Sequence, residues 1–423
     1  MARELPSASL VENVRFNALV IVPNAVQGLF RRRRGPVAAA TRAGVDGHAI
    51  GLLRGMRERH GPGPIWIRIV RDRALLVLSV DGVRRVLSGS PDPFASDPQS
   101  KRRGMVAFQP DALTISRDGQ WEQRRRFTEA VLDTGRRHRL ADRFEAVAAE
   151  EARAMLEAAD GELDWDAWRA AFGRITRRIV LGDAARDDEA VTDLLAELMS
   201  EANGMPGEPS DRLPELQGMI ERYVAAAEDG SLVSLFTAAP AGPATRPAGQ
   251  VQHWLFASFD TLAINAFRCL ALLASHPEQR ERAAGDADHL VACLHEAMRL
   301  WPTTPMLARE TVTEVDWDDA AVPAGTQVLF PNTFLHRDPD GLDFADRFAP
   351  EAWTDGAAGD DWRFNHLSHG PQGCPGAGIA VAVGTAVLRA VLERAAPTLE
   401  SPRLDPARPL PHMLDFFGIR VAV

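Results

Sequence analysis

The sequence predicts a mainly α-helical protein with small β-sheets, and three observations support this fold class. Helical periodicity dominates from residue 119 to about residue 301 and returns over 375–396. Short alternating or apolar segments typical of strands fall near 64–89, 310–334 and 399–423. No internal repeat interrupts this order. We therefore expect a helical body with small sheets at one side.

The individual elements follow from the same pattern in chain order. Residues 64–89 indicate two short strands followed by a helix, and 91–118 indicate mainly loop. Glycine and proline mark a loop at 203–214 and a flexible connection at 239–249. The predicted helices are 119–134, 140–158, 163–181, 187–202, 214–229, a short one near 231–238, 249–275, 286–301 and 375–396. A terminal β-hairpin is predicted near 399–423.

Length and composition place the chain among large globular proteins. It has 423 residues, of which 45% are hydrophobic and 25% charged. Its formal net charge of -10 argues against a nucleic-acid binder, which normally carries a basic footprint. Lys101 is the only lysine, which we interpret as a coding bias and not as functional evidence. Because the motifs are spread along the chain, we predict a single unit over 1–423, with an N-terminal segment and first helix at 1–60 and the main body at 61–423.

The cysteines and the N-terminus indicate a soluble protein in a reducing compartment. Three cysteines do not suggest a disulfide framework, so we expect a cytoplasmic location. Cys269 and Cys293 lie in apolar helical patterns and are expected to be buried small hydrophobes. Residues 17–30 are apolar but too short to span a membrane, and their basic cluster follows them, the wrong order for a secretion signal. Between a peripheral surface helix and a helix packed on the protein body, we favour the second.

The strongest local signal is the segment LSHGPQGCPGAGIA at residues 367–380. Three glycines surround Cys374, and glycine permits close backbone approach and positive φ. Pro375 suits the start of a following helix, which places Cys374 at a helix N-terminus where a thiolate is stabilised. Such a thiolate is suited to binding a metal. On this segment alone, a glycine-rich turn before an ordinary helix with a buried cysteine explains the pattern equally well.

A second signal joins Glu296 to Arg299. The two residues share one helix face and can pair, although such pairs usually decorate solvated surfaces. An aromatic and arginine cluster follows at 344–350, and Arg347 within it would complete a buried triad.

Two further pairs carry chemistry that depends on their surroundings. Asp260 and Thr261 are adjacent in an otherwise apolar helix, where an acid and a hydroxyl are costly without partners. Either Thr261 bonds back to a carbonyl and Asp260 faces water, or the helix opens locally around a proton path. Trp121 and Arg125 are one turn apart, and their N–H groups can bind one carboxylate together. The plainer interpretation is a solvated basic helix with one buried tryptophan.

Together and in this order, the four signals resemble the cytochrome P450 superfamily over roughly residues 60–420. The family's cysteine segment typically reads Phe-Gly-x-Gly-x-Arg/His-x-Cys-x-Gly. The matching positions are Cys374, Gly370, Gly376 and Ala380, and the departures are Leu367, Ser368 and Gln372, with Ser258 standing where glycine is usual in the long helix. The segments His276-Pro277-Glu278-Gln279 and His336-Arg337-Asp338-Pro339 also look like family segments.

The resemblance implies the cytochrome P450 fold, a triangular helical prism around a buried haem b whose iron is held by Cys374. It implies a structural role for Glu296, Arg299 and Arg347. The expected cofactor-binding residues are Trp121, Arg125, Arg309, Gly370, Gln372 and Gly376. Because Gln372 replaces the residue that usually binds a haem propionate, this task is expected to fall on Trp121, Arg125 and Arg309.

The implied activity is that of a bacterial, soluble haem-thiolate monooxygenase, which inserts one oxygen atom from O2 into a largely hydrophobic small molecule. Hydroxylation in specialised metabolism is the expectation, with Asp260 and Thr261 delivering protons. No reductase segment is found, so electrons are expected one at a time from a ferredoxin or flavodoxin with its reductase. We expect a monomer with no transmembrane segment.

The same resemblance predicts where substrate and electron donor meet the protein. The pocket walls are expected from the stretches 94–108 and 203–214 and from Phe108, Phe256, Ala257, Met306, Leu307, Met413 and Leu414. These apolar side chains favour a hydrophobic substrate, although each is also consistent with ordinary core packing. The expected basic docking patch for an acidic ferredoxin consists of Arg124, Arg126, Arg136, Arg137 and Arg139.

Two other functions stay open at this point. A haem peroxygenase that uses H2O2 is loosely suggested by Pro375 after Cys374, but that branch usually carries an Arg-Pro pair where this chain has Asp260 and Thr261. A non-catalytic or degenerate haem-binding member of the family needs no proton relay, so the retention of Asp260 and Thr261 argues against it.

Overall fold

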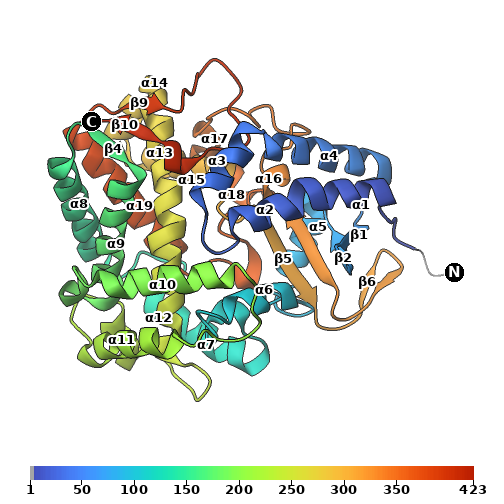
Figure 1. Ribbon diagram of the computed structural model, residues 1–423, viewed down its shortest axis with the longest axis horizontal. Helices are drawn as coiled ribbons and strands as arrows, with labels where there is room; N and C mark the ends of the chain where they lie inside the picture. Colours follow the sequence, from blue (N-terminus) through green and yellow to red (C-terminus); the bar gives the residue numbers. More distant parts are fainter. Residues whose placement is uncertain (1–3) are drawn as a thin grey trace.

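The computed structural model describes residues 4–423 and confirms a mainly helical architecture with small sheets. Figure 1 shows most helices gathered in one part of the molecule, while the largest sheet and the N-terminal helices form the other. A long continuous helix, built from α12, a π-helical segment and α13, runs through the helical part.

The helices lie largely where periodicity predicted them. Near the N-terminus are α1 (Leu10–Phe16), a π-helical segment (Asn17–Ile21), α2 (Val22–Gln27), α3 (Arg34–Arg42) and α4 (Val45–His60). Then come α5 (Val80–Ser88), α6 (Gln99–Met105), α7 (Asp118–Leu132), α8 (Ala141–Ala158), α9 (Trp165–Leu181), α10 (Glu189–Ala202) and α11 (Leu213–Ala226). The rest are α12 (Pro247–Phe256), a π-helical segment (Ala257–Leu262), α13 (Ala263–Ser275), α14 (Pro277–Gly285), α15 (Ala287–Leu300), α16 (Asn332–Leu335), α17 (Glu351–Thr354), α18 (Ala357–Asp360) and α19 (Ala377–Arg394).

Three sheets accompany the helices. The largest has the order β1 (Ile65–Ile69), β2 (Asp72–Leu76), β8 (Gln327–Pro331), β5 (Met306–Thr311) and β3 (Phe94–Ala95). Its neighbours are antiparallel except β2 and β8, which are parallel. An antiparallel sheet joins β4 (Glu162–Asp164), β10 (Arg420–Ala422) and β9 (Thr398–Ser401), and β6 (Val315–Trp317) pairs with β7 (Ala320–Val322). The predicted terminal hairpin is therefore present, with β4 added to it.

Among the helices that periodicity did not predict, α14 and α6 show the physical reasons. The α14 sequence is polar around nearly its whole circumference, and Ala283 is its buried residue, so it shows no apolar stripe. The α6 helix lies in 91–118, which we predicted to be mainly loop, and its seven residues include three basic ones. Both helices depend on the surrounding fold more than on their own patterns.

The N-terminal segment packs on the protein body as expected, but one of its faces stays exposed. Phe16 and Val20 are buried against the sheet side of the molecule, as expected for a helix on the protein body. The opposite face, however, is exposed and apolar. Its exposed residues are Leu10, Val11, Val14, Val22, Val26 and Leu29.

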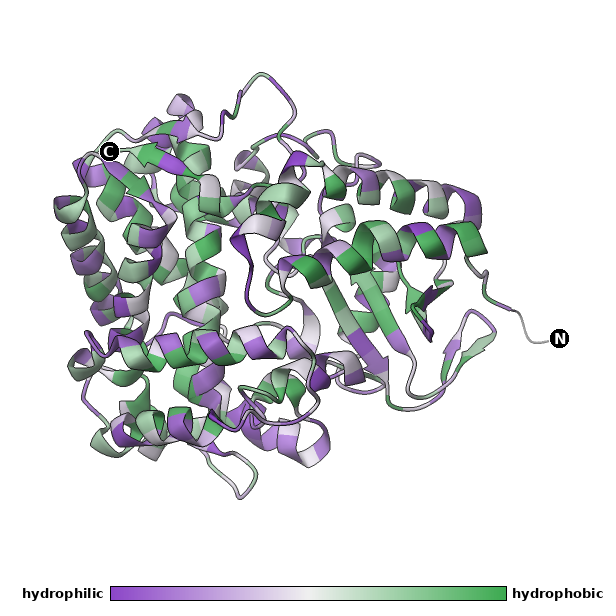
Figure 2. Ribbon diagram, in the orientation of Figure 1, coloured by the Kyte–Doolittle hydropathy of each residue, from purple (hydrophilic) through white to green (hydrophobic). Residues whose placement is uncertain are grey.

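The core has two large clusters, one among the helices from α7 to α19 and one between the N-terminal helices and the largest sheet, and a small third cluster around Leu342 and Phe364. Figure 2 shows hydrophobic residues along the strands of this sheet and along the long central helix. The helix Pro247–Ser275 is, among the described residues, the one segment long and apolar enough to cross a membrane, and most of it is buried in the core. Cys269 and Cys293 are buried there, as predicted.

Candidate active site

Cys374 lies in a tight loop between a turn at Gly370–Gln372 and the start of α19; we refer to residues 367–376 as the Cys374 loop. The Cys374 N–H donates to the Leu367 carbonyl at 2.8 Å. Gly370 has φ +71°, and a Cβ there would lie 2.3 Å from the Leu87 carbonyl oxygen at the end of α5. Only glycine fits this approach, which explains the glycine before the cysteine.

The surroundings of Cys374 both oppose and favour a thiolate. The residue is exposed at its surface. The protein around the sulfur nevertheless disfavours a charged thiolate, and this desolvation raises the pKa of the thiol. The Gly376 N–H and the positive charge of Arg125 lower the same pKa. A metal cation at the sulfur would outweigh the desolvation, since cysteine binds metals as the thiolate.

The helix α7 is tied directly to this loop. Arg125 Nη1 donates to the Gly373 carbonyl at 2.7 Å, and its Nε donates to the Glu129 carboxylate at 2.6 Å. Trp121 lies one turn earlier, partly exposed. The structure thus places Arg125 beside the Cys374 loop, whereas Trp121 makes no hydrogen bond or ring contact with that loop among the described residues; Arg125 already shares its charge with Glu129, which sequence reasoning did not foresee.

Arg309 on β5 is a buried cation without a carboxylate. Its guanidinium donates to Ser90 Oγ at 3.3 Å, to the Ala308 carbonyl at 3.0 Å and to Ser368 Oγ at 3.2 Å, all neutral oxygens. It is 3% exposed, and desolvation lowers its pKa to about 10. Ser368 belongs to the Cys374 loop. A buried guanidinium held this way is well suited to receive an external carboxylate.

Lys101 is a second buried cation near Arg309, and sequence reasoning dismissed it. Its ammonium donates to the Ser96 carbonyl at 3.1 Å and to the Thr114 carbonyl at 2.9 Å, and it also contacts the Thr114 hydroxyl. Desolvation and the charge of Arg309 lower its pKa to about 7. The signal that could have identified it is that Lys101 is the only lysine in a chain whose other basic side chains of this kind are all arginines.

These residues fit a haem. Cys374 offers one sulfur for iron. Arg309 is a buried cation with no carboxylate partner, and a haem propionate would supply that carboxylate. Gln372 has a buried Oε1 without a hydrogen-bond partner; its amide NH2 can donate to a propionate but brings no positive charge. At Gly376 a Cβ would meet Leu132 at an ordinary 3.7 Å, so protein packing alone does not demand glycine there.

Asp260 and Thr261 lie where the long helix opens locally. This opening is what the second of the two interpretations predicted. Residues 257–262 form a π-helical segment, and Thr176 Oγ1 donates to Ser258 Oγ at 3.0 Å. Such segments free backbone groups and often mark functional sites. Burial raises the pKa of Asp260 and the charge of Arg31 opposes this rise; Arg31 Nη1 contacts Asp260 Oδ1 at 2.8 Å.

The predicted pocket side chains separate into two groups. Phe108 and Leu414 are 0% and 1% exposed and pack within the core, and their role in a pocket stays a prediction. The remaining predicted residues are partly exposed. They are Phe256, Ala257, Met306, Leu307 and Met413.

Glu296 and Arg299 form a fully buried, two-pronged ion pair on α15. Arg299 Nε and Nη2 each donate to a Glu296 oxygen at 2.7 Å. The Ala349 N–H and Trp353 Nε1 donate to the same carboxylate at 2.9 and 2.8 Å. Arg347 contributes only its carbonyl, which accepts from Arg299 at 3.0 Å, and its guanidinium does not join. The expected side-chain triad is therefore wrong, because backbone and indole N–H groups already fill the carboxylate.

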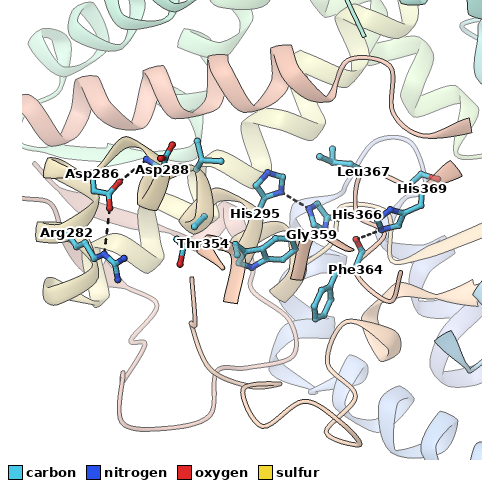
Figure 3. Close-up of a pocket in the computed structure, with 14 residues that line it drawn as sticks. Arg282, Asp286, Asp288, His295, Thr354, Gly359, Phe364, His366, Leu367 and His369 are labelled. Atoms are coloured by element: carbon cyan, nitrogen blue, oxygen red, sulfur yellow. Dashed lines mark hydrogen bonds and ion pairs between the residues drawn. The ribbon is translucent and has the colours of Figure 1, made fainter. Parts of the chain in front are cut away.

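Histidines connect this pair to the Cys374 loop. His336 Nδ1 donates to the Arg299 carbonyl and its Nε2 accepts from the Asn365 N–H, both at 3.1 Å. His366 and His295 contact each other through ring nitrogens at 3.1 Å. Figure 3 shows these two side chains facing each other in a cavity of about 620 Å³ that the Cys374 loop borders through Leu367.

The predicted basic docking patch is weaker than its sequence suggested. Arg124 is buried and donates to Asp111 at 2.9 Å, so it cannot belong to a surface patch. Arg136 and Arg139 both pair with the buried Asp133. Arg137 pairs with Asp142 and Glu145, whereas Arg126 is exposed and has no ion pair among the described residues.

The Cys374 loop and the buried Glu296–Arg299 pair both lie in or next to the part of the chain that resembles known proteins. The family model "Cytochrome P450" matches residues 247–394. "Cytochrome P450 714C3" of Oryza sativa subsp. japonica is 32% identical over 34% of this chain and 33% of its own length. "Cyclooctat-9-en-7-ol 5-monooxygenase" of Streptomyces melanosporofaciens is 29% identical over 25% and 26%. The aligned part thus spans about a third or less of these relatives. Residues 247–394 thus match the cytochrome P450 superfamily, and this match implies a haem iron cofactor.

Proposed function

We propose that the protein is a haem-thiolate monooxygenase that binds haem b through Cys374 and inserts one oxygen atom from O2 into a hydrophobic small molecule. The observation that carries this proposal is the glycine-shaped Cys374 loop beside the uncompensated buried cation of Arg309. The Streptomyces relative is named a monooxygenase, which supports the reaction class; hydroxylation in bacterial specialised metabolism is our proposal for this chain.

Bound haem supplies an iron that activates dioxygen once electrons are delivered. Cys374 would hold the iron through its sulfur, and Arg309 would neutralise a propionate. Thr261 and Asp260 move protons along the opened helix, where freed backbone groups and the Thr261 hydroxyl offer successive hydrogen-bond partners. The apolar side chains of Phe256 and Met306 keep bulk water from the reacting centre.

We also propose that electrons come from a ferredoxin or flavodoxin with its reductase, and that the protein acts as a cytoplasmic monomer formed by one unit over residues 1–423. The three free cysteines support a reducing compartment.

The thiolate assignment is tested by the reduced protein with carbon monoxide. The wild type should show a strongly red-shifted Soret band, and Cys374→Ala should abolish it. Cys293→Ala, which removes a buried core cysteine, is the matched control and should keep the band. An unchanged spectrum in Cys374→Ala would contradict the proposal.

Turnover separates the monooxygenase from a peroxygenase. Reduction through ferredoxin should consume one O2 for each product formed, and peroxide alone should support far less turnover. Thr261→Ala should maintain oxygen consumption but divert it to hydrogen peroxide, and Asp260→Asn should slow turnover. If both variants couple oxygen to product normally, the proton relay is wrong.

A further inference from the structure

The loop that joins α2 to α3 carries two adjacent arginines into the molecule beside the opened helix; we refer to Gly28–Arg33 as the arginine loop. In Figure 1 this loop reaches from the N-terminal helices toward the long central helix. Asn203 at the end of α10 fixes it. The Asn203 side chain accepts from the Phe30 N–H at 2.9 Å and donates to the Arg31 carbonyl at 2.9 Å.

The two arginines differ in their partners. Arg31 contacts Asp260 at 2.8 Å. Arg32 makes no hydrogen bond or ion pair with any residue that the structure describes, and its Nη1 is buried without a partner. Asp46 and Asp260 act on Arg32 through space only, and Asp260 is already engaged by Arg31. Arg32 is thus a cation whose surroundings exclude water from part of it without supplying a counterion.

A second guanidinium strengthens this imbalance. Arg268 on α13 donates to the Trp301 and Leu414 carbonyls at 2.9 Å each, and its Nε is buried without a partner. Desolvation and the positive charge of Arg32 lower the pKa of Arg268 to about 9. Buried cations without acid partners are unfavourable, and an anion bound beside them removes this cost.

Aromatic side chains next to the arginine loop supply an apolar surface. The Phe30 and Phe108 rings meet edge to face at 5.9 Å, and Phe108 meets Phe256 in the same way at 5.8 Å. Phe256 ends α12, directly before the opened segment. Phe30 of the arginine loop is therefore joined through the core residue Phe108 to Phe256, which is predicted to line the substrate pocket.

We propose that Arg32 binds a carboxylate of the substrate, so that the substrate class is a hydrophobic carboxylic acid. A guanidinium offers a carboxylate two parallel hydrogen bonds, and Arg268 adds positive potential behind it. The proposal rests on the proposed monooxygenase function, because it assigns the substrate class of the same pocket.

Matched ligand pairs test the proposal by isothermal titration calorimetry and by the spin-state change of the haem spectrum. The pairs are decanoate with decanamide and 4-phenylbutyrate with 4-phenylbutyramide. In the wild type at least one acid should bind about tenfold or more tightly than its amide. Arg32→Gln should weaken the acid about 10- to 100-fold and leave the amide within about twofold. Arg32→Lys should keep part of the preference, because it retains the charge.

Two further variants sharpen the result. Arg33→Gln removes an exposed arginine of the same loop and should change neither ligand. Asp46→Asn removes the carboxylate that competes for Arg32 and should tighten acid binding severalfold. Arg32→Gln should not destabilise the protein, because it removes a charge that has no partner.

Three outcomes overturn the proposal. They are equal affinity for acid and amide in both pairs, equal weakening by Arg33→Gln, and a marked loss of stability in Arg32→Gln, which would show that the arginine is already neutralised in the folded chain. A wild type that prefers the acid but lacks the red-shifted carbon monoxide band would instead contradict only the proposed haem-thiolate function.

Discussion

The Cys374 loop and the arginine loop both bring ionisable groups into the protein, but they are held in different ways. The Cys374 loop is shaped by contacts close in sequence, such as the Cys374 N–H bond to the Leu367 carbonyl. The arginine loop is fixed by partners far away, since Asn203 and Asp260 lie 172 and 229 positions from Arg31. A sequence motif therefore reveals the first loop, and only the fold reveals the second.

The two regions also differ in how completely their charges are satisfied. Behind the Cys374 loop, the Glu296 carboxylate receives four hydrogen bonds, two of them from Arg299. In the arginine loop, Arg32 has no such partner among the described residues. A fully satisfied buried pair stabilises one arrangement, whereas an unsatisfied cation is available to a ligand. The following variants test this distinction.

The largest effect is expected where the network is complete. Glu296→Gln leaves the Arg299 guanidinium buried without its counterion, which costs about 3–5 kcal/mol. Urea unfolding and the haem content of purified protein should both decline. Glu351→Gln, which removes an exposed carboxylate on α17, should change stability by less than about 0.5 kcal/mol. Full stability and haem content with lost turnover would indicate a catalytic role for Glu296 instead.

The next largest effect is expected from acid, which should lower the free energy of unfolding through His336. His336 is fully buried, and this desolvation lowers its pKa to about 3; in the folded protein its Nε2 accepts from the Asn365 N–H and is therefore unprotonated. The folded state binds fewer protons than the unfolded state, so this stability is present above pH 6.5 and is lost as the pH falls toward 3. From pH 6.5 to pH 5 the loss is about 2 kcal/mol.

The measurement is urea unfolding at pH 7, 6 and 5. His336→Gln retains a donor and an acceptor but does not titrate, so its stability should fall less over the same range. His48→Gln, an exposed histidine, should follow the wild type. Equal pH dependence in wild type and His336→Gln would contradict the assignment.

Sequence alone predicted the fold class and much of the thiolate side, since both depend on local patterns. Helical periodicity located the long helix, and the spacing of Glu296 and Arg299 placed them on one face. Arg347 was assigned by its residue type, although its carbonyl and not its guanidinium meets Arg299. A backbone partner of this kind leaves no trace in residue identity.

Charge clusters misled sequence reasoning for a related reason. Five arginines near α7 suggested an open basic surface, but acids from other positions neutralise three of them and Arg124 is buried. Arg31 and Arg32 were read only as a basic cluster after an apolar segment, because their partners lie elsewhere in the chain. Net charge in a window does not determine which charges face solvent.

A smaller effect is expected in the arginine loop. Arg31→Gln removes the cation that opposes the raised pKa of Asp260, so that pKa rises further. Stability linked to a carboxyl with a raised pKa is present below its unfolded value near 4 and is lost as the pH rises. The variant should therefore resemble the wild type at pH 4 and lose about 1–2 kcal/mol at pH 7.

Unfolding at the two pH values checks this prediction without reference to turnover. In an Asp260→Asn background the difference between pH 4 and pH 7 should disappear, because the titrating group is gone. Arg33→Gln is the control. A deficit in Arg31→Gln that is equal at both pH values would show that Asp260 does not titrate in response to Arg31.

The smallest effect is expected at the protein surface, where Arg126 is the one arginine of the predicted docking patch that is exposed and has no ion pair among the described residues. Arg126→Glu should slow the first electron transfer from ferredoxin at low salt. A single exposed charge acts through a screened field worth less than about 1 kcal/mol, so the rate should fall by at most about fivefold. Arg137→Glu should do less, since Asp142 and Glu145 already neutralise Arg137.

Stopped-flow reduction between 20 mM and 500 mM salt separates steering from docking, because steering disappears as the Debye length shortens while substrate affinity stays constant. Arg222→Glu, an exposed arginine on α11, is the matched control. If Arg126→Glu and Arg222→Glu slow reduction equally, the ferredoxin responds to net charge and not to this helix.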